Sequence, residues 1–211
     1  MNDIILFDYW RSSAAYRVRI VLNLKGVPYT AVPTSLLAGD HKAPEYVARN
    51  PQGFVPMLSI DGHDFTQSLA IIDYLDANYH DPKMVSPEPA ARAKTLAQAM
   101  VIAADIHPVN NLRVLRYLKD KLGHDQAAID DWYRHWILEG FTALEAMAPD
   151  DGLFGSDLPN LADVCLVPQM ANARRFDTPL EAFPKLVRID ATLTEMPAFK
   201  AAHPDVVNPD A

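Results

Sequence analysis

The sequence predicts a small α/β domain followed by an all-helical domain. Up to about residue 75, short apolar runs typical of strands alternate with helical patterns. The stretch 80–89 contains three prolines and no periodic apolar pattern, and the apolar patterns after it are helical. We therefore expect one domain over residues 1–80 and a second over residues 88–211.

Composition excludes several classes of function. The chain has 211 residues, 49% of them hydrophobic, which is enough for a sizeable core. Its net charge of −8 and lack of a basic run argue against nucleic acid or a membrane surface as a partner. No apolar stretch approaches about 18 residues and no signal peptide is visible, so we expect a soluble cytoplasmic protein. The single cysteine, Cys165, is expected to be buried, and no metal site is predicted.

An apolar strand, Ile4–Phe7, is followed by a loop and then by the first helix. Its apolar residues share one face: Ala14, Val18, Val21 and Leu22. Its basic residues lie off that face: Arg17, Arg19 and Lys25. Ser12 and Ser13 stand at the helix N-terminus, where unpaired N–H groups and the helix dipole favour an anion. An ordinary serine cap is the alternative interpretation.

The remainder of the α/β domain predicts a second strand, a hairpin and a helix. Residues 29–32 complete a βαβ unit, whose strands should be parallel with a right-handed crossover. Asp61-Gly62 lies between two short strands and predicts a hairpin turn. Ser68 is a candidate N-cap for the helix that follows the hairpin. Pro56 heads the third strand, where a cis Val55–Pro56 bond would turn the Val55 backbone outward.

The second half predicts a helical bundle. Helices are expected over 90–106, 110–122 and 126–147, and the last has these candidates for its buried face: Ile129, Trp132, Trp136 and Leu144. The run Asn160 to Asp163 resembles a capping box, and the helix it starts is apolar nearly all round, so it should be central. Residues 203–211 are expected to form a loose tail.

Two motifs resemble those of the zeta-class glutathione transferases, which include the maleylacetoacetate and maleylpyruvate isomerases. The first is RSSA followed by RVRI in residues 11–20, with Ala14 at the family's cysteine position. The second is ADVCLVPQMANARRF, residues 162–176. The resemblance spans the whole chain. It implies the glutathione transferase fold, with a thioredoxin-like N-terminal domain and an all-α C-terminal domain.

The resemblance implies glutathione as the cofactor and assigns its contacts. The hydroxyl of Ser12 or Ser13 would stabilise the thiolate, beside Arg11. The Val55–Pro56 bond would be cis, so that Val55 pairs through its backbone with the cysteinyl unit, and Gln67-Ser68 would hold the γ-glutamyl carboxylate. The full set of glutathione-binding residues expected on this basis is His41, Val55, Pro56, Gln67, Ser68, His107 and Asn111.

The resemblance further implies a cis–trans isomerase of aromatic degradation. Such an enzyme converts a dianionic maleyl keto acid to its fumaryl isomer through reversible addition of glutathione. Arginine suits the substrate's carboxylates because it can bind them through two parallel hydrogen bonds. Arg11, Arg113 and Arg175 are the expected substrate contacts, with Arg174 as an alternative to Arg175. A lone arginine is more often part of a surface salt bridge.

Several alternatives stay open from the sequence. The chain could be a general glutathione S-transferase that conjugates small electrophiles, or a non-catalytic glutathione-binding relative. For the isomerase, either maleylpyruvate or maleylacetoacetate remains possible as the substrate. A homodimer is implied by the resemblance alone.

Overall fold

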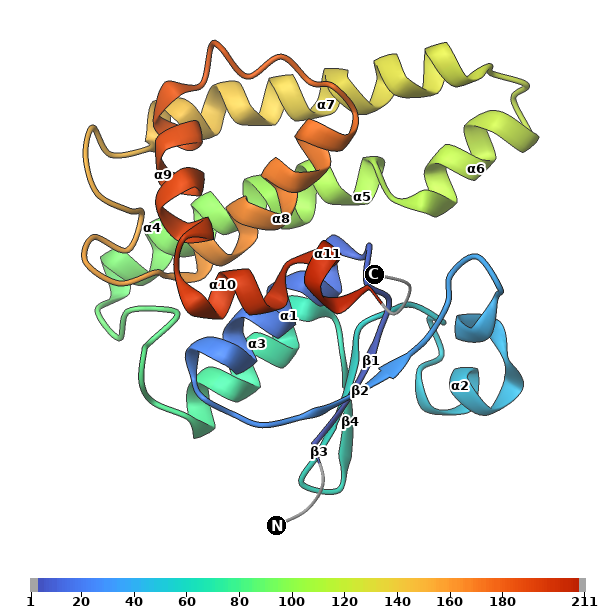
Figure 1. Ribbon diagram of the computed structural model, residues 1–211, viewed down its shortest axis with the longest axis horizontal. Helices are drawn as coiled ribbons and strands as arrows, with labels where there is room; N and C mark the ends of the chain where they lie inside the picture. The colour runs from blue at the N-terminus through green and yellow to red at the C-terminus, as the bar shows by residue number, and fades with distance from the viewer. Residues whose placement is uncertain (1–3, 209–211) are drawn as a thin grey trace. The chain divides into compact units, whose positions relative to one another are not determined.

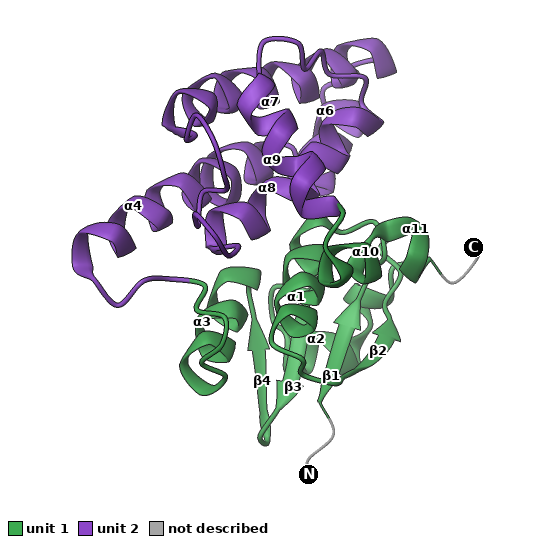
Figure 2. Ribbon diagram, turned by 60° about the vertical axis from the view of Figure 1, so that its left-hand side comes forward, with its two compact units in different colours: residues 1–84, 195–211 green, residues 85–194 purple. Residues whose placement is uncertain are grey.

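The chain divides at residue 84, inside the Pro-rich stretch that the sequence marks as a linker. The structure is a computed structural model that describes residues 4–208. Unit 1 comprises Met1–Met84 with Glu195–Ala211, and unit 2 comprises Val85–Thr194 (Figure 2). The C-terminal residues thus belong to unit 1, which differs from the predicted span 88–211. The functional roles assigned to the two predicted domains stay predictions.

Unit 1 is built on a mixed sheet, which in the described residues has four strands in the order β2-β1-β3-β4. The strands are β1 (Ile5–Asp8), β2 (Thr30–Pro33), β3 (Met57–Ile60) and β4 (His63–Thr66). As predicted, β1 and β2 are parallel, while β3 is antiparallel to both β1 and β4. Figure 1 shows α1 (Ser13–Leu24) and α3 (Ser68–Asn78) side by side, with α2 (Pro44–Arg49) across the sheet from them. A short turn of helix, η1 (Asp40–Lys42), precedes α2.

Helix α1 is buried on all sides, which its single apolar face did not indicate. Every residue from Ser13 to Leu22 is buried, and Arg17 and Arg19 are only 2% and 1% exposed. The cover comes partly from the C-terminal helix α10 (Pro197–Ala202), which packs along α1 (Figure 1).

The expectation of a loose C-terminal tail is wrong for the described residues. Asn23 Nδ2 donates a hydrogen bond of 3.0 Å to the carbonyl of Ala198 in α10. A further short helix, α11 (Pro204–Val207), follows α10, and the His203 ring contacts the Tyr16 ring edge-on at 6.1 Å between centroids. Residues 209–211 lie outside the described part of the chain.

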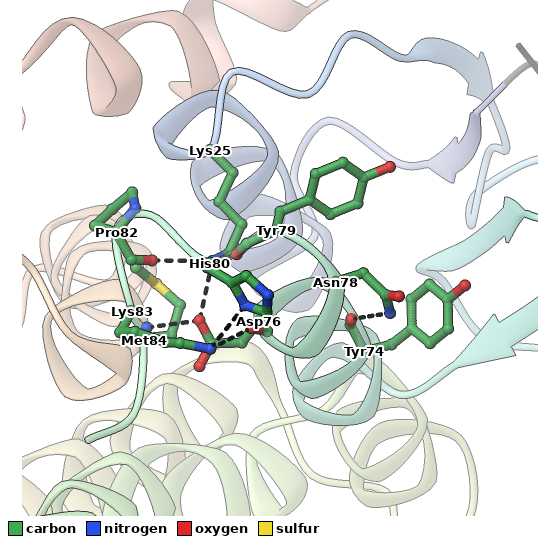
Figure 3. Close-up of polar contacts among 9 residues, drawn as sticks. All are labelled: Lys25, Tyr74, Asp76, Asn78, Tyr79, His80, Pro82, Lys83 and Met84. Carbon is green, nitrogen blue, oxygen red and sulfur yellow. Dashed lines mark hydrogen bonds and ion pairs between the residues drawn. The ribbon is translucent and has the colours of Figure 1, made fainter. Parts of the chain in front are cut away.

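A buried lysine ties the end of α1 to the segment that leaves unit 1 (Figure 3). Lys25 Nζ donates to the carboxylate of Asp76 at 2.9 Å and to the carbonyls of Tyr79 and Pro82 at 2.6 and 2.9 Å. Asp76 also accepts a 2.8 Å hydrogen bond from the Met84 backbone N–H. The Lys25 side chain is fully buried, so these oxygens take the place of its hydration shell.

Unit 2 is helical, as predicted. In the described residues its helices are α4 (Pro89–Met100), the π-helical segment η2 (Val101–Ile106), α5 (His107–Val109), α6 (Leu112–Asp120), α7 (Gln126–Met147), α8 (Leu161–Arg175) and α9 (Pro184–Thr194). Helix α8 is the buried one, with 12 of its 15 residues inside, including Cys165. Its capping box is confirmed, because Asn160 and Asp163 each accept the other's backbone N–H.

Two details of unit 2 differ from the prediction. The helix expected over 90–106 changes to π-helical geometry at Val101, and this π-helical segment ends at Ile106, directly before His107. In α7 the tryptophans are only partly buried, and the inward face is made by Ile129, Tyr133, Ile137, Phe141 and Leu144. Among residues 4–208, none of the helices combines the length and the apolar composition that a membrane span requires.

Candidate active site

Strand register brings three predicted segments to one edge of the sheet in unit 1. Phe7 of β1 and Thr66 of β4 both pair with Met57, the first residue of β3. Because β1 and β4 are each antiparallel to β3, both end at the edge where β3 begins. The segments that follow β1, precede β3 and follow β4 therefore meet there. They are residues 9–13, Val55–Pro56 and Gln67–Ser68.

Ser12 is the N-cap of α1. Its Oγ accepts a hydrogen bond of 3.2 Å from the backbone N–H of Ala15, and its own N–H donates to the Tyr9 carbonyl at 2.7 Å. A hydroxyl that accepts in this way still has its hydrogen to donate. Ser13, the first residue of the helix, is buried at 8% exposure. The cap interpretation and the anion-site interpretation of Ser12 are thus compatible.

Arg11 lies next to Ser12 and is exposed. Its guanidinium carbon is 4.3 Å from the centroid of the Trp10 ring, a stacking contact that favours one direction for a long side chain. The structure thus places an always-charged group beside the helix N-terminus.

Gln67 has an unusual backbone conformation at this edge. Its φ of 67° is rare for a residue with a side chain, and such strained residues cluster at ligand-binding sites. Its Nε2 donates to Gln52 Oε1 at 2.6 Å. Gln52 was assigned no role from the sequence, although it stands three residues before Val55, and this position is the signal that could have found it.

Ser68 is linked to α1 by a buried cation. Arg17 Nη1 donates to Ser68 Oγ at 3.3 Å, so a side chain from the second turn of α1 reaches the start of α3. Ser68 is buried at 6% exposure and is the first residue of α3, so the N-cap is Gln67 and not Ser68 as predicted. The two helix N-termini are therefore parts of one connected arrangement.

The segment before β3 is fixed by hydrogen bonds to the Phe54 carbonyl. Tyr46 Oη and Asn50 Nδ2 both donate to it, at 2.5 and 2.7 Å. The Val55–Pro56 peptide bond is cis, as predicted. His41 is buried, and a Cβ at Gly53 would lie 2.8 Å from the His41 carbonyl, so only glycine fits there.

Three further predicted residues lie together in unit 2. His107 begins α5 directly after the π-helical segment, a geometry that is frequent at functional sites. Asn111 caps α6, and its Oδ1 accepts the backbone N–H of Arg113 at 3.1 Å. Arg113 is exposed.

Arg174 and Arg175 have different surroundings in unit 2. Arg174 Nη2 donates to the buried carboxylate of Asp190 at 2.5 Å, so its charge is already paired. Arg175 stacks over the Phe176 ring at 5.0 Å, and Phe176 stacks on Tyr133. Burial raises the pKa of Tyr133, and the Arg175 guanidinium opposes that rise. These contacts favour Arg175 over Arg174 as the residue that binds a carboxylate of the substrate.

Known proteins resemble the whole chain. Residues 2–77 match the family described as Glutathione S-transferase, N-terminal domain. A maleylacetoacetate isomerase of Rhizobium meliloti (strain 1021) is 48% identical over 211 residues, 99% of each chain. A solved holo structure of a maleyl pyruvate isomerase, described as a zeta-class bacterial glutathione S-transferase, superposes with a TM-score of 0.95 at 39% identity, covering 98% of this chain and 100% of that one. The chain belongs to the zeta-class glutathione transferases.

A further relative was solved with small molecules bound. The maleylacetoacetate isomerase of Methylobacterium extorquens AM1, with bound malonate and GSH, has a TM-score of 0.90 at 35% identity, covering 98% of this chain and 99% of that one. The predicted family and fold of this glutathione transferase are confirmed. The roles of its individual site residues stay predictions.

Proposed function

We propose that this protein is a glutathione-dependent cis–trans isomerase that converts a maleyl keto acid to its fumaryl isomer. The observation that carries the proposal is the single sheet edge where Ser12, Val55 and Gln67-Ser68 meet. The likeness to two named isomerases supports it over the full length of the chain.

The residues at this edge fit glutathione. Its γ-glutamyl carboxylate needs hydrogen-bond donors and a positive field, and the N-terminus of α3 with Gln67 and Ser68 supplies both. Its sulfur needs a donor that favours the ionised form, and the Ser12 hydroxyl has a hydrogen available at the N-terminus of α1.

Bound glutathione supplies the thiolate that adds to the cis double bond and leaves after rotation about the bond. Ser12 donates a hydrogen bond to the sulfur, and the helix dipole of α1 lowers the thiol pKa. Arg11, Arg113 and Arg175 hold the anionic ends of the substrate. A protein of charge −8 repels a dianion at long range, so binding depends on cations acting within about 8 Å, the Debye length in physiological salt.

The arginines distinguish this function from general conjugation, because a neutral electrophile gains nothing from them. Changing Arg113 or Arg175 to Met should lower kcat/KM for isomerisation roughly tenfold to a hundredfold, equivalent to ~1.5 to 3 kcal/mol for a lost charged hydrogen bond. Conjugation of a neutral aromatic electrophile and glutathione affinity should survive. Arg116→Met is the matched control, since Arg116 is an exposed arginine on the same helix as Arg113.

Selective loss of isomerisation in the first two variants supports the isomerase. Equal loss of both activities, or loss of neither, favours a general transferase. Parallel assays with maleylpyruvate and maleylacetoacetate decide which acyl group the enzyme accepts. A homodimer is part of the proposal by family resemblance, and sedimentation as a monomer at micromolar concentration contradicts it.

A further inference from the structure

Arg19 makes contacts with three separate parts of unit 1. Its Nη1 donates to both carboxylate oxygens of Asp8, at 2.7 and 2.8 Å, where β1 ends. Its Nη2 donates to the Trp10 carbonyl at 3.2 Å, and its Nε donates to the Ala202 carbonyl of α10 at 3.0 Å. The guanidinium is buried and also lies 5.2 Å from the centroid of the Tyr16 ring.

The Trp10 carbonyl belongs to the loop that carries the proposed chemistry. Arg11 follows it directly, and Ser12 is the next residue. The loop is bonded to itself through the Ser12 N–H, which donates to the Tyr9 carbonyl. Arg19 lies almost two helical turns into α1, so it bonds the loop to a part of α1 that is fully buried.

Packing alone leaves this loop open on one side. A cavity of about 260 Å³ lies against it, lined by Tyr9 and Trp10 from the loop, Asp8 and Arg19 from the ion pair, and Val207 from α11. The pocket is partly open to solvent, so the side chains that line it are packed against fewer protein atoms than side chains in the close-packed core. Directional hydrogen bonds from a rigid donor are the remaining restraint on that side.

We propose that Arg19 is a positioning residue, which holds the loop of Arg11 and Ser12 in its active geometry and bonds that loop to helix α10. The guanidinium suits this task because its planar fork donates in several fixed directions at once. Arg19 thus joins the Trp10 carbonyl in the loop to the Ala202 carbonyl in α10, almost 200 residues later in the chain. In this way the C-terminal helix contributes to the geometry of the loop. The catalytic consequence rests on the proposed function, whereas the effect on the loop does not.

Removing the Arg19 charge altogether would leave Asp8 buried without its partner and could unfold the protein. The test is therefore Arg19→Lys, because an ammonium can still pair with Asp8 but cannot also reach both carbonyls. Asn23→Ala is the matched control. Asn23 is on the same helix and bonds the Ala198 carbonyl of the same α10, but it does not touch the loop.

The first measurement is amide hydrogen exchange of the unliganded protein in peptides that contain Ser12. Arg19→Lys should speed exchange of the Ser12 amide at least about tenfold, while Asn23→Ala leaves it unchanged. The second is ultraviolet titration of glutathione bound to each variant. Arg19→Lys should raise the thiol pKa and lower kcat for isomerisation roughly ten- to a hundredfold, with KM for glutathione little changed.

The inference is overturned if the Ser12 amide exchanges at the same rate in Arg19→Lys as in the wild-type protein. It is also overturned if Arg19→Lys and Asn23→Ala speed this exchange equally. Faster exchange in Arg19→Lys alone supports it, even if the wild-type protein shows no isomerase activity. A wild-type protein without isomerase activity would contradict the proposed function, but the faster exchange in Arg19→Lys would still establish the role of Arg19 in the loop.

Discussion

Asp163 and Asn160 hold each other's backbone at the start of the buried helix α8. Asp163 Oδ2 accepts the Asn160 N–H at 2.9 Å, and Asn160 Oδ1 accepts the Asp163 N–H at 3.3 Å. The carboxylate also accepts the N–H groups of Phe154 and Gly155 at 3.0 and 2.9 Å. It is fully buried, and this burial raises its pKa from 3.8 to about 6 despite the three hydrogen bonds.

This raised pKa predicts a pH dependence of stability. Between pH 3.8 and about 6 the folded state binds the Asp163 proton and the unfolded state does not, so this contribution to stability decreases as pH rises. The loss over the window is on the order of 3 kcal/mol. The free energy of unfolding should be measured by urea denaturation from about pH 4 to about pH 7, for the wild-type protein and for Asp163→Asn. The stability of the wild-type protein should fall relative to that of the variant as the pH rises through this window, and parallel pH profiles would contradict the assignment.

Ser12→Ala should raise the pKa of the bound glutathione thiol and lower kcat for isomerisation about a hundredfold. Loss of one hydrogen-bond donor to a developing charge typically lowers kcat by about this factor. It also removes an N-cap, which should lower the free energy of unfolding by about 1 kcal/mol. Asp125→Ala is the control, since Asp125 caps α7 in the same way through the Ala128 N–H. The control should lose similar stability with no change in the thiolate absorbance. An unaltered thiol pKa in Ser12→Ala would exclude Ser12 as the donor.

Gln67→Gly should separate stability from binding. Glycine adopts positive φ without strain, so the substitution should leave stability unchanged or raise it by about 1 kcal/mol. Glutathione should bind roughly tenfold more weakly, because the amide side chain is lost. Ser156→Gly relieves a matching φ of 68° in unit 2 and should not affect binding. Calorimetric titration and thermal unfolding provide both quantities, and unweakened glutathione binding by Gln67→Gly would remove Gln67 from the site.

Lys25→Met should lower the free energy of unfolding by roughly 3 to 5 kcal/mol, since it leaves the Asp76 carboxylate without its buried partner. Arg49→Met breaks a pair with Asp64 in which both side chains are partly exposed, and should change stability by less than about 1 kcal/mol. Urea denaturation of the two variants compares them directly. Similar losses would show that burial does not set the strength of the Lys25 pair.

The sequence predicted the parts of this site that are encoded locally. The helix start at Ser12 and Ser13 depends on a few neighbouring residues, as does the hairpin turn at Asp61-Gly62, which lies at the opposite end of the sheet from the site. The cis bond before Pro56 is implied by the family resemblance. The strand register then brings the segments that follow β1, precede β3 and follow β4 to one edge of the sheet.

The sequence could not predict contacts whose partners are far apart in the chain. Arg17, Arg19 and Lys25 are charged residues off the apolar face of α1, yet all three are buried. The reason is tertiary, because Arg17 donates to Ser68 and Arg19 to Ala202, 51 and 183 residues away. Helical periodicity detects an apolar face, whereas burial of a charge depends on oxygens that only the fold supplies.

The most direct test of the proposed function is a product analysis with very little glutathione. Purified protein is mixed with a maleyl keto acid and glutathione at a small fraction of the substrate concentration, and proton NMR follows both compounds. The account predicts complete conversion to the fumaryl isomer, recovery of glutathione unchanged, and no conversion when glutathione is left out. Product that stops at the amount of glutathione added and carries it as a conjugate would contradict the account, as would conversion that needs no glutathione.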